Sequence, residues 1–197
     1  MDGGSLGAGY DLRSIKFAEQ GLVQQTVELD LPQVVEGKQR LLQSKRMLQR
    51  RPWLDNTAGH ENATLLPTFL PADLNNVTSV RQIVTDQLCA RCTNTSNDQS
   101  DQPDDWHTIF LFEGVMIYLN DGVPSALLNV TSDVLNQLKV PGSLVFADRL
   151  ENIPGGDEAL GMDELQRNGW KLQDWCPKPG LARHMGSADL LSTNISL

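Results

Sequence analysis

The chain has 197 residues, 40% of them apolar, and its 25 acidic residues against 16 Lys and Arg give a formal charge of −9. A chain of this size and apolar content can bury a core, since a domain of about 150 residues buries roughly 70% of its unfolded surface, and this excludes a disordered protein. The acidic excess argues against nucleic-acid binding, because Lys and Arg supply most of the affinity for phosphates. We therefore expect one folded domain without a nucleic-acid partner.

The sequence carries no recognisable signal for export or for a membrane. Residues 1–5 lack the basic and apolar stretches of a secretory signal, and no segment approaches the roughly 18 apolar residues of a membrane span. The cysteines, Cys89, Cys92 and Cys176, are too few for a disulfide framework and fit a reducing compartment. We expect a cytoplasmic protein with no metal site at Cys89 and Cys92, since zinc needs about four ligands.

The first part of the chain alternates short apolar runs with helical periods, as in the βαβ units of a parallel sheet. A first strand is barely present, because only Ser5-Leu6 precedes the turn Gly7-Ala8-Gly9. Gln25–Leu29 predicts a strand that ends at Asp30. Between Pro32 and Leu48 the apolar residues recur at seven-residue spacing, which predicts one amphipathic helix with a proline in its first turn.

The middle of the chain continues this alternation. Leu65–Ala72, with two prolines, predicts a short edge strand, and Val77–Leu88 predicts a helix. Residues 90–105 are rich in Asn, Asp, Ser and Thr without an apolar period, so we expect a solvated loop there. Thr108–Phe112 is almost entirely apolar and ends at Glu113, as expected for a central strand whose carboxyl end opens to solvent.

The last part of the chain predicts a helix, a strand, a second helix and two strands. Apolar residues with a period of 3.6 predict a helix over 127–138, and Ser143–Ala147 predicts a buried strand. Glu158–Asn168 predicts a short helix closed by a glycine. Trp170–Cys176 and Ala182–Leu191 flank a Pro-Gly turn, so we expect an antiparallel hairpin at the end of the sheet.

The chemically informative residues follow the strands, where open α/β sheets bind their ligands. Gly7 and Gly9 lie between a strand and a helix and would let the backbone approach a ligand closely. Asp30, about twenty residues further on, can accept both hydroxyls of a ribose. The third glycine of the dinucleotide fingerprint is absent, because position 12 is Leu. This favours a nucleoside ligand that has no pyrophosphate.

Three further residues follow the third and fourth strands. Asp73 would reach the exocyclic amine of an adenine while Leu74 packs against the ring. Asp30 and Asp73 can also be read as ordinary turn or helix N-cap aspartates. Glu113 is harder to explain structurally, because a carboxylate that closes so apolar a strand needs water, a partner or a ligand.

Four motifs occur in a characteristic order along the chain. They are Gly7-Ala8-Gly9-Tyr10-Asp11, the segment 27–38 around Leu29-Asp30-Leu31-Pro32, Pro71-Ala72-Asp73-Leu74, and the segment 112–119 that begins Phe112-Glu113-Gly114. In this order and spacing they resemble the leucine carboxyl methyltransferase family of class I, S-adenosylmethionine-dependent O-methyltransferases. The resemblance covers about residues 5–150. It implies a Rossmann-like α/β sheet of seven strands, mostly parallel with an antiparallel last strand, in a single domain over 1–197.

The resemblance also implies roles for the residues at the strand ends. For the cofactor S-adenosylmethionine these are Gly7 and Gly9 at the methionine part, Asp30 at the ribose, Asp73 and Leu74 at the adenine, and Glu113 at the amino group. Tyr118 would face the donor sulfur and the substrate. Members of the family carry a helical segment before the glycine motif, whereas six residues precede Gly7 here. We therefore expect that segment to be missing and the first strand to be truncated.

The reaction that the resemblance implies is methyl transfer to a carboxylate of a protein C-terminus or of a small acid. A carboxylate is already ionised at pH 7, so we assign no residue to proton transfer. The branch of the family that modifies transfer RNA is disfavoured by the acidic charge. The alternative function is that of a catalytically impaired, truncated homologue that serves as a cofactor-binding or interaction domain.

Overall fold

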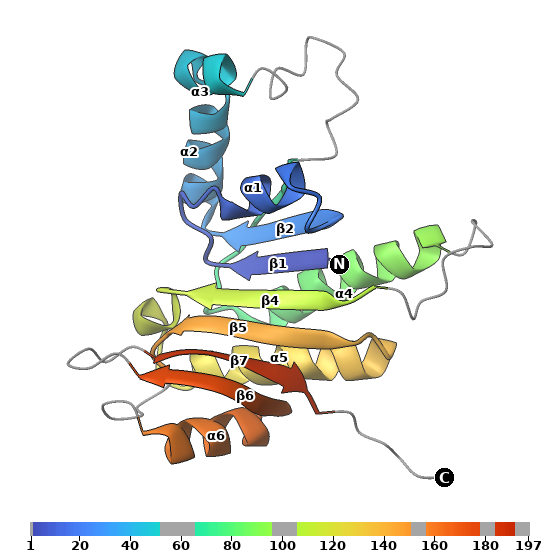
Figure 1. Cartoon of the computed structure of the whole chain (residues 1–197), viewed down its shortest axis with the longest axis vertical. Helices are drawn as coiled ribbons and strands as arrows, with labels where there is room; N and C mark the ends of the chain where they lie inside the picture. Colours follow the sequence, from blue (N-terminus) through green and yellow to red (C-terminus); the bar gives the residue numbers. More distant parts are fainter. Residues whose placement is uncertain (1, 52–65, 96–105, 151–156, 178–183, 192–197) are drawn as a thin grey trace.

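The computed structural model describes residues 2–51, 66–95, 106–150, 157–177 and 184–191 (Figure 1). Seven strands form one sheet in the order β3-β2-β1-β4-β5-β7-β6. The strands are β1 (Asp2–Leu6), β2 (Gln25–Asp30), β3 (Thr68–Pro71), β4 (Thr108–Glu113), β5 (Gly142–Asp148), β6 (Trp170–Pro177) and β7 (His184–Leu190). The pairs from β3 to β5 are parallel, and β7 is antiparallel to both β5 and β6. The structure confirms the predicted fold class, including the antiparallel hairpin.

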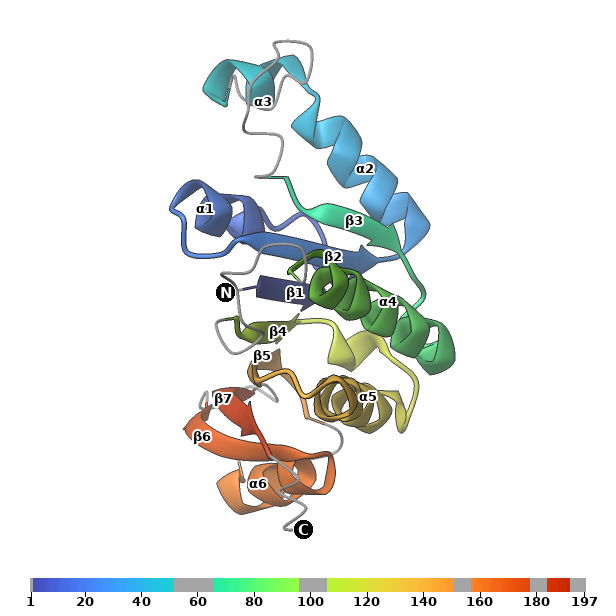
Figure 2. The same cartoon turned by 90° about the vertical axis from the view of Figure 1, so that its right-hand side faces the viewer.

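Within the described residues, six helices and one short turn connect the strands. They are α1 (Arg13–Glu19), α2 (Pro32–Leu42), α3 (Lys45–Arg50), α4 (Val77–Thr95), the 3-10 turn η5 (Met116–Tyr118), α5 (Val123–Leu138) and α6 (Glu158–Arg167). In Figure 1 the helices α4 and α5 lie behind the sheet, and Figure 2 shows α1 on the opposite side of the sheet from them. The sheet is therefore the middle layer of the fold.

The main core lies between the sheet and the pair α4 and α5. Phe112 and Phe146 of the strands are at most 1% exposed, and Val80 of α4 and Leu127 of α5 are fully buried. Because parallel strands that are packed against helices cannot shift independently, this core fixes the carboxyl ends of β1, β2 and β4 relative to one another.

The first strand is longer than the sequence indicates. The strand β1 pairs residue by residue with Gln25–Leu29 of β2 and with Thr108–Phe112 of β4. The expectation that little more than Ser5-Leu6 remains of this strand is therefore wrong. Gly3 and Gly4 gave no strand signal because glycine has low β propensity, and the pairing on both sides overrides that propensity.

Two helices also differ from the prediction. The expected single helix over 32–48 is divided into α2 and α3, because Ser44 takes up an extended backbone (φ −66°, ψ 144°) before a new helix begins. Helix α4 continues to Thr95, so the first part of the expected 90–105 loop is helical. Arg91 helps to hold these last turns, since its Nη2 donates to Gln24 Oε1 at 2.7 Å. The remainder of that segment lies outside the described residues.

A buried ion pair joins α2 to the sheet. Lys38 and Glu28 are 1% and 3% exposed, and Lys38 Nζ lies 2.5 Å from Glu28 Oε2. The other oxygen of Glu28 accepts from Ser14 Oγ of α1, and the Lys38 ammonium lies 5.7 Å from the ring centroid of Phe69 in β3. These contacts connect four elements in the half of the sheet that carries Asp30.

Replacing Lys38 with Met should lower the free energy of unfolding by about 3–5 kcal/mol, because Glu28 would be left buried without its cation. The double variant Glu28→Gln with Lys38→Met should regain most of this loss, since both charges are then gone. Urea unfolding followed by circular dichroism measures both effects. Lys16→Met, on the exposed side of α1, is the matched control, and a Lys38→Met loss no larger than that of the control would contradict this account.

Candidate functional site

Two adjoining cavities open at the carboxyl ends of the parallel strands. The first, of about 360 Å³, is lined by Asp30, Asp73, Leu74 and Tyr118 among others. The second, of about 520 Å³, is lined by Glu113, and the two cavities share Gly7, Gly9 and Gly114. All the site residues predicted from the sequence therefore line this one edge of the sheet. It is the point where the strand order reverses on either side of β1, the usual ligand position in such sheets.

The two glycines of the turn after β1 are required for different reasons. Gly7 has φ +72°, and a Cβ there would lie 2.3 Å from Val115 Cγ2, so no larger residue fits against the segment after β4. Gly9 has φ +51°, and a Cβ there would meet no atom within 4 Å. Gly7 therefore serves close packing, whereas Gly9 presents accessible backbone to the cavities.

The carboxylate of Asp30 ties the glycine turn to the end of β2. Its Oδ2 accepts from Gly9 N at 2.7 Å, and its Oδ1 accepts from Leu31 N at 2.7 Å. Each carboxylate oxygen can accept more than one hydrogen bond. Asp30 is thus held by the backbone on one side and can accept a pair of ligand hydroxyls on the other.

Asp73 and Leu74 lie across the first cavity, after β3. Asp73 Oδ1 accepts from Asn75 N at 2.9 Å, so this residue also forms the turn that the sequence allowed as its structural role. Leu74 belongs to the main core and is 5% exposed, and it also lines the first cavity. Asn75 Oδ1 accepts from Asn120 N at 2.9 Å, which connects this turn to the segment after η5.

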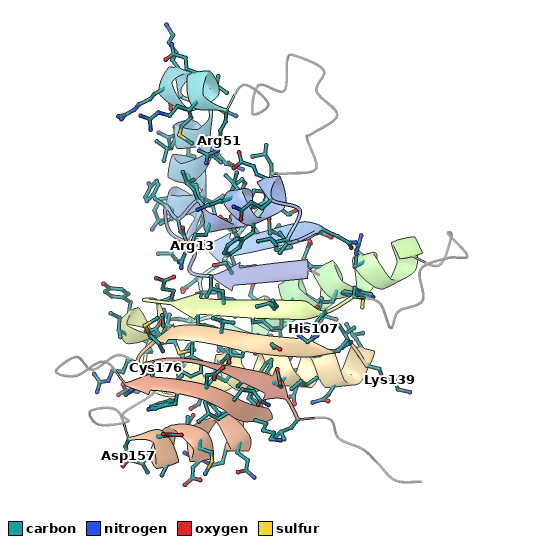
Figure 3. The ribbon with its side chains drawn as sticks, in the orientation of Figure 1. Arg13, Arg51, His107, Lys139, Asp157 and Cys176 are labelled. Carbon is teal, nitrogen blue, oxygen red and sulfur yellow. The ribbon has the colours of Figure 1, made fainter. Side chains whose placement is uncertain are left out.

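Glu113 is engaged by a cation that the sequence reading did not assign to the site. Arg13 Nη2 donates to Glu113 Oε2, and Arg13 Nε donates to Asp11 Oδ2 at 2.5 Å. The three side chains are between 34% and 45% exposed. Figure 3 shows Arg13 at the edge of the sheet where β1 and β4 end. The only sequence signal for Arg13 was its place directly after the glycine motif, at the start of a helix.

A second missed residue, Asp148, holds the turn that carries Tyr118. Asp148 is fully buried, and its Oδ2 accepts from Val115 N at 2.6 Å and from Met116 N at 2.8 Å. Its Oδ1 accepts from Arg149 N at 2.8 Å. Tyr118 itself is 76% exposed at the mouth of the first cavity. The signal was present, because Asp148 closes an apolar strand just as Glu113 does.

A His-Ser-Asp chain lies at the opposite end of the strands, but the direction of its hydrogen bonds does not suit a hydrolase. Ser143 Oγ donates to Asp189 Oδ1 at 2.6 Å, and His107 Nε2 lies 2.9 Å from the same Oγ. The serine proton is committed to the aspartate, so the histidine N–H donates to the hydroxyl and cannot act as its base. Figure 3 shows His107 at the far end of the sheet from Arg13.

Metal ligation and membrane insertion find no support in the described part of the chain. No three His, Cys, Asp or Glu side chains among these residues are grouped closely enough to hold a metal ion. None of the described helices combines the length and apolar character that crossing a membrane requires. Cys89 and Cys176 carry free thiols, and the side chain of Cys92 lies outside the described residues.

The sheet order, the glycine turn and the acidic residue after β2 are together those of the S-adenosylmethionine-dependent methyltransferases. A model of the leucine carboxyl methyltransferase family matches residues 5–132, and the chain belongs to that family. No curated protein matches the chain.

Several solved structures share this fold, and two of those described next are named as methyltransferases. The pyocyanin biosynthetic protein PhzM is 11% identical with a TM-score of 0.52, over 96% of this chain and 50% of its own. Magnesium protoporphyrin IX methyltransferase of Synechocystis PCC 6803, solved with bound SAM, is 15% identical with a TM-score of 0.53, over 95% of this chain and 69% of its own. A putative O-methyltransferase of Nostoc punctiforme PCC 73102 is 11% identical with a TM-score of 0.51, and the match covers 95% of this chain and 51% of that protein. The chain thus spans about half the length of two of these proteins.

Replacing Asp148 with Ala should release the turn that carries Tyr118. The backbone N–H groups of Val115 and Met116 would lose their acceptor, which should lower the free energy of unfolding by about 1–3 kcal/mol. Amide hydrogen exchange at these two positions should accelerate more than exchange in α5. Asp86→Ala, on the exposed face of α4, is the control and should cost within about 0.5 kcal/mol. Unchanged exchange at Val115 and Met116 would show that Asp148 does not hold the turn.

Proposed function

We propose that this protein binds S-adenosylmethionine at the edge formed by β1, β2, β3 and β4 and methylates a carboxylate of a protein C-terminus or of a small acid. The observation that carries the cofactor site is the coupling of Gly9 to Asp30. Their hydrogen bond places accessible backbone and a carboxylate acceptor on one wall of the first cavity. Membership of the leucine carboxyl methyltransferase family supports the choice of acceptor.

The chemistry of the lining residues fits this cofactor. The two cavities are lined by the carboxylates of Asp11, Asp30, Asp73 and Glu113, with Arg13 as the one Lys or Arg among their described lining residues. S-adenosylmethionine, when bound, supplies an electrophilic methyl group on a positively charged sulfur. An acidic lining favours a ligand with positive charge over a nucleotide with phosphates.

Each residue would bind through the group that it presents. Asp30 would accept the ribose hydroxyls, because both of its oxygens are fixed by backbone N–H donors. Asp73 and Leu74 would hold the adenine by one polar and one apolar contact, and Glu113 would accept from the amino group. Gly9 leaves room beside the methionine part, since a Cβ there would project into open space, while Gly7 lets the turn pack closely against Val115.

Catalysis would rest on positioning. The acceptor carboxylate is already ionised, so no base has to remove a proton from it. Holding the reacting groups in line and excluding water can lower a barrier by about 7–11 kcal/mol. Tyr118 would orient the acceptor, because it lies exposed at the mouth of the cavity on a turn that Asp148 fixes.

Replacing Asp30 with Ala should weaken binding of S-adenosylhomocysteine by about 1–3 kcal/mol, because two ribose hydroxyls lose their acceptor. Isothermal titration calorimetry of the folded protein measures the dissociation constant directly. Glu36→Ala, an exposed carboxylate on α2, is the matched control. An unchanged dissociation constant for Asp30→Ala would show that Asp30 does not bind the ribose. If the wild-type protein does not bind S-adenosylhomocysteine, the proposed function is overturned.

Replacing Tyr118 with Ala should slow methyl transfer at least tenfold while leaving S-adenosylhomocysteine affinity within twofold of wild type. The assay offers a peptide with a free C-terminal leucine and the same peptide as its C-terminal amide, and scores methanol released by alkali from the methyl ester. The peptide with the free carboxylate should be methylated, and the amide should not. If the wild-type protein binds S-adenosylhomocysteine but methylates neither peptide, the interaction-domain alternative is favoured.

A further inference from the structure

We propose that Arg13 binds the carboxylate of the cofactor's methionyl group while Glu113 binds its ammonium, so that the Arg13–Glu113 ion pair of the free protein opens into a two-point clamp for an α-amino-acid zwitterion. This inference rests on the proposed function and adds to it a binding residue, Arg13. It also implies that Arg13 and Glu113 pair with each other when no ligand is bound.

The charges of the lining point to Arg13 as the carboxylate partner. The second cavity is lined by the carboxylates of Asp11 and Glu113, and the adjoining cavity by those of Asp30 and Asp73. A ligand carboxylate that enters among these groups is repelled unless a cation meets it. Among the described lining residues of the two cavities, Arg13 is the side chain that can do so.

The attachment of Arg13 suits this role. Its Nε donates to Asp11 Oδ2 at 2.5 Å, and its backbone N donates to Asp11 Oδ1 at 3.0 Å, so the side chain is anchored at its base. Its outer Nη2 reaches Glu113 across the ends of β1 and β4. A guanidinium has more N–H donors than these contacts use, and its planar fork matches a carboxylate. With 45% of the side chain exposed, the outer end can be reached by a ligand.

The electrostatic balance of the exchange is favourable. Asp11, Arg13 and Glu113 together carry a charge of −1, because one guanidinium serves two carboxylates. When a zwitterion enters, the single Arg13–Glu113 contact is replaced by one contact from Arg13 to the ligand carboxylate and one from the ligand ammonium to Glu113. The residual negative charge suits a cofactor whose sulfur is also positive.

The carboxylate of the methyl acceptor is the other possible ligand for Arg13. The geometry favours the cofactor, because Arg13 lines the same cavity as Glu113, whereas Tyr118, the residue proposed for the acceptor, lines only the other cavity. Titrations performed without any acceptor separate the two sources, since only the cofactor's carboxylate is then present.

The test compares two ligands that differ in the amino-acid group alone. S-adenosylhomocysteine carries the zwitterion, and 5′-methylthioadenosine has the same nucleoside thioether without it. Arg13→Gln should weaken S-adenosylhomocysteine binding about 10- to 100-fold in calorimetric titrations, as expected for a lost charge-assisted bidentate contact. Its affinity for 5′-methylthioadenosine should stay within twofold of wild type. Glu113→Gln should show the same selective loss, and Arg40→Gln, an exposed arginine on α2, should change neither affinity.

The other outcomes are decisive in different ways. Equal losses for both ligands in Arg13→Gln would mean that Arg13 only supports the fold of the turn, and this would overturn the clamp. An unchanged S-adenosylhomocysteine affinity in Arg13→Gln would also overturn it, leaving the acceptor as the ligand of Arg13. If the wild-type protein binds both ligands equally well, the nucleoside site stands and the clamp fails. If the wild-type protein binds neither ligand, the proposed function itself fails.

Discussion

The pairing of β1 with both β2 and β4 is the constraint on which the rest of this site depends. Five residues, Asp2–Leu6, form ladders on both sides and bring the ends of β2 and β4 to the same edge. Without β1 between them, Asp30 and Glu113 would belong to separate parts of the chain. The glycine turn begins where this strand ends, so the same pairing also sets the position of Gly9 beside Asp30.

Two carboxylates fix the walls of the site by the same means, which is acceptance of backbone N–H groups. Asp30 accepts from Gly9 and Leu31, and Asp148 accepts from Val115 and Met116. Hydrogen bonds to a charged acceptor are stronger than those between neutral groups. The two turns that frame the cavities are therefore held by charge-assisted contacts, while the cavity-lining side chains of Glu113 and Tyr118 stay accessible. Rigidity and accessibility are thus assigned to different residues.

The sequence predicted well which residues line the cavities at the carboxyl ends of the strands, because this prediction depends on local patterns. An apolar run followed by a carboxylate marks a strand end, and parallel strands bring their ends together, so Asp30, Asp73 and Glu113 could be grouped before any coordinates. The features that the sequence did not predict depend on contacts between positions far apart in the chain. Gly3 and Gly4 form a strand because of their neighbours, and Lys38 is buried although Lys is usually a surface residue. The contact of Arg13 with Glu113 joins positions one hundred residues apart, and no spacing rule reaches that far.

The close approach of Gly7 to Val115 has a consequence for how this chain can change. A Cβ at Gly7 would occupy the space that the Val115 methyl group fills, so the two positions share one volume. A larger residue at position 7 could be accommodated only together with a smaller one at position 115, in addition to the strain of its positive φ. The two positions should therefore be epistatic. Because Val115 precedes the turn that carries Tyr118, a substitution at the glycine motif would also shift the turn at the mouth of the first cavity.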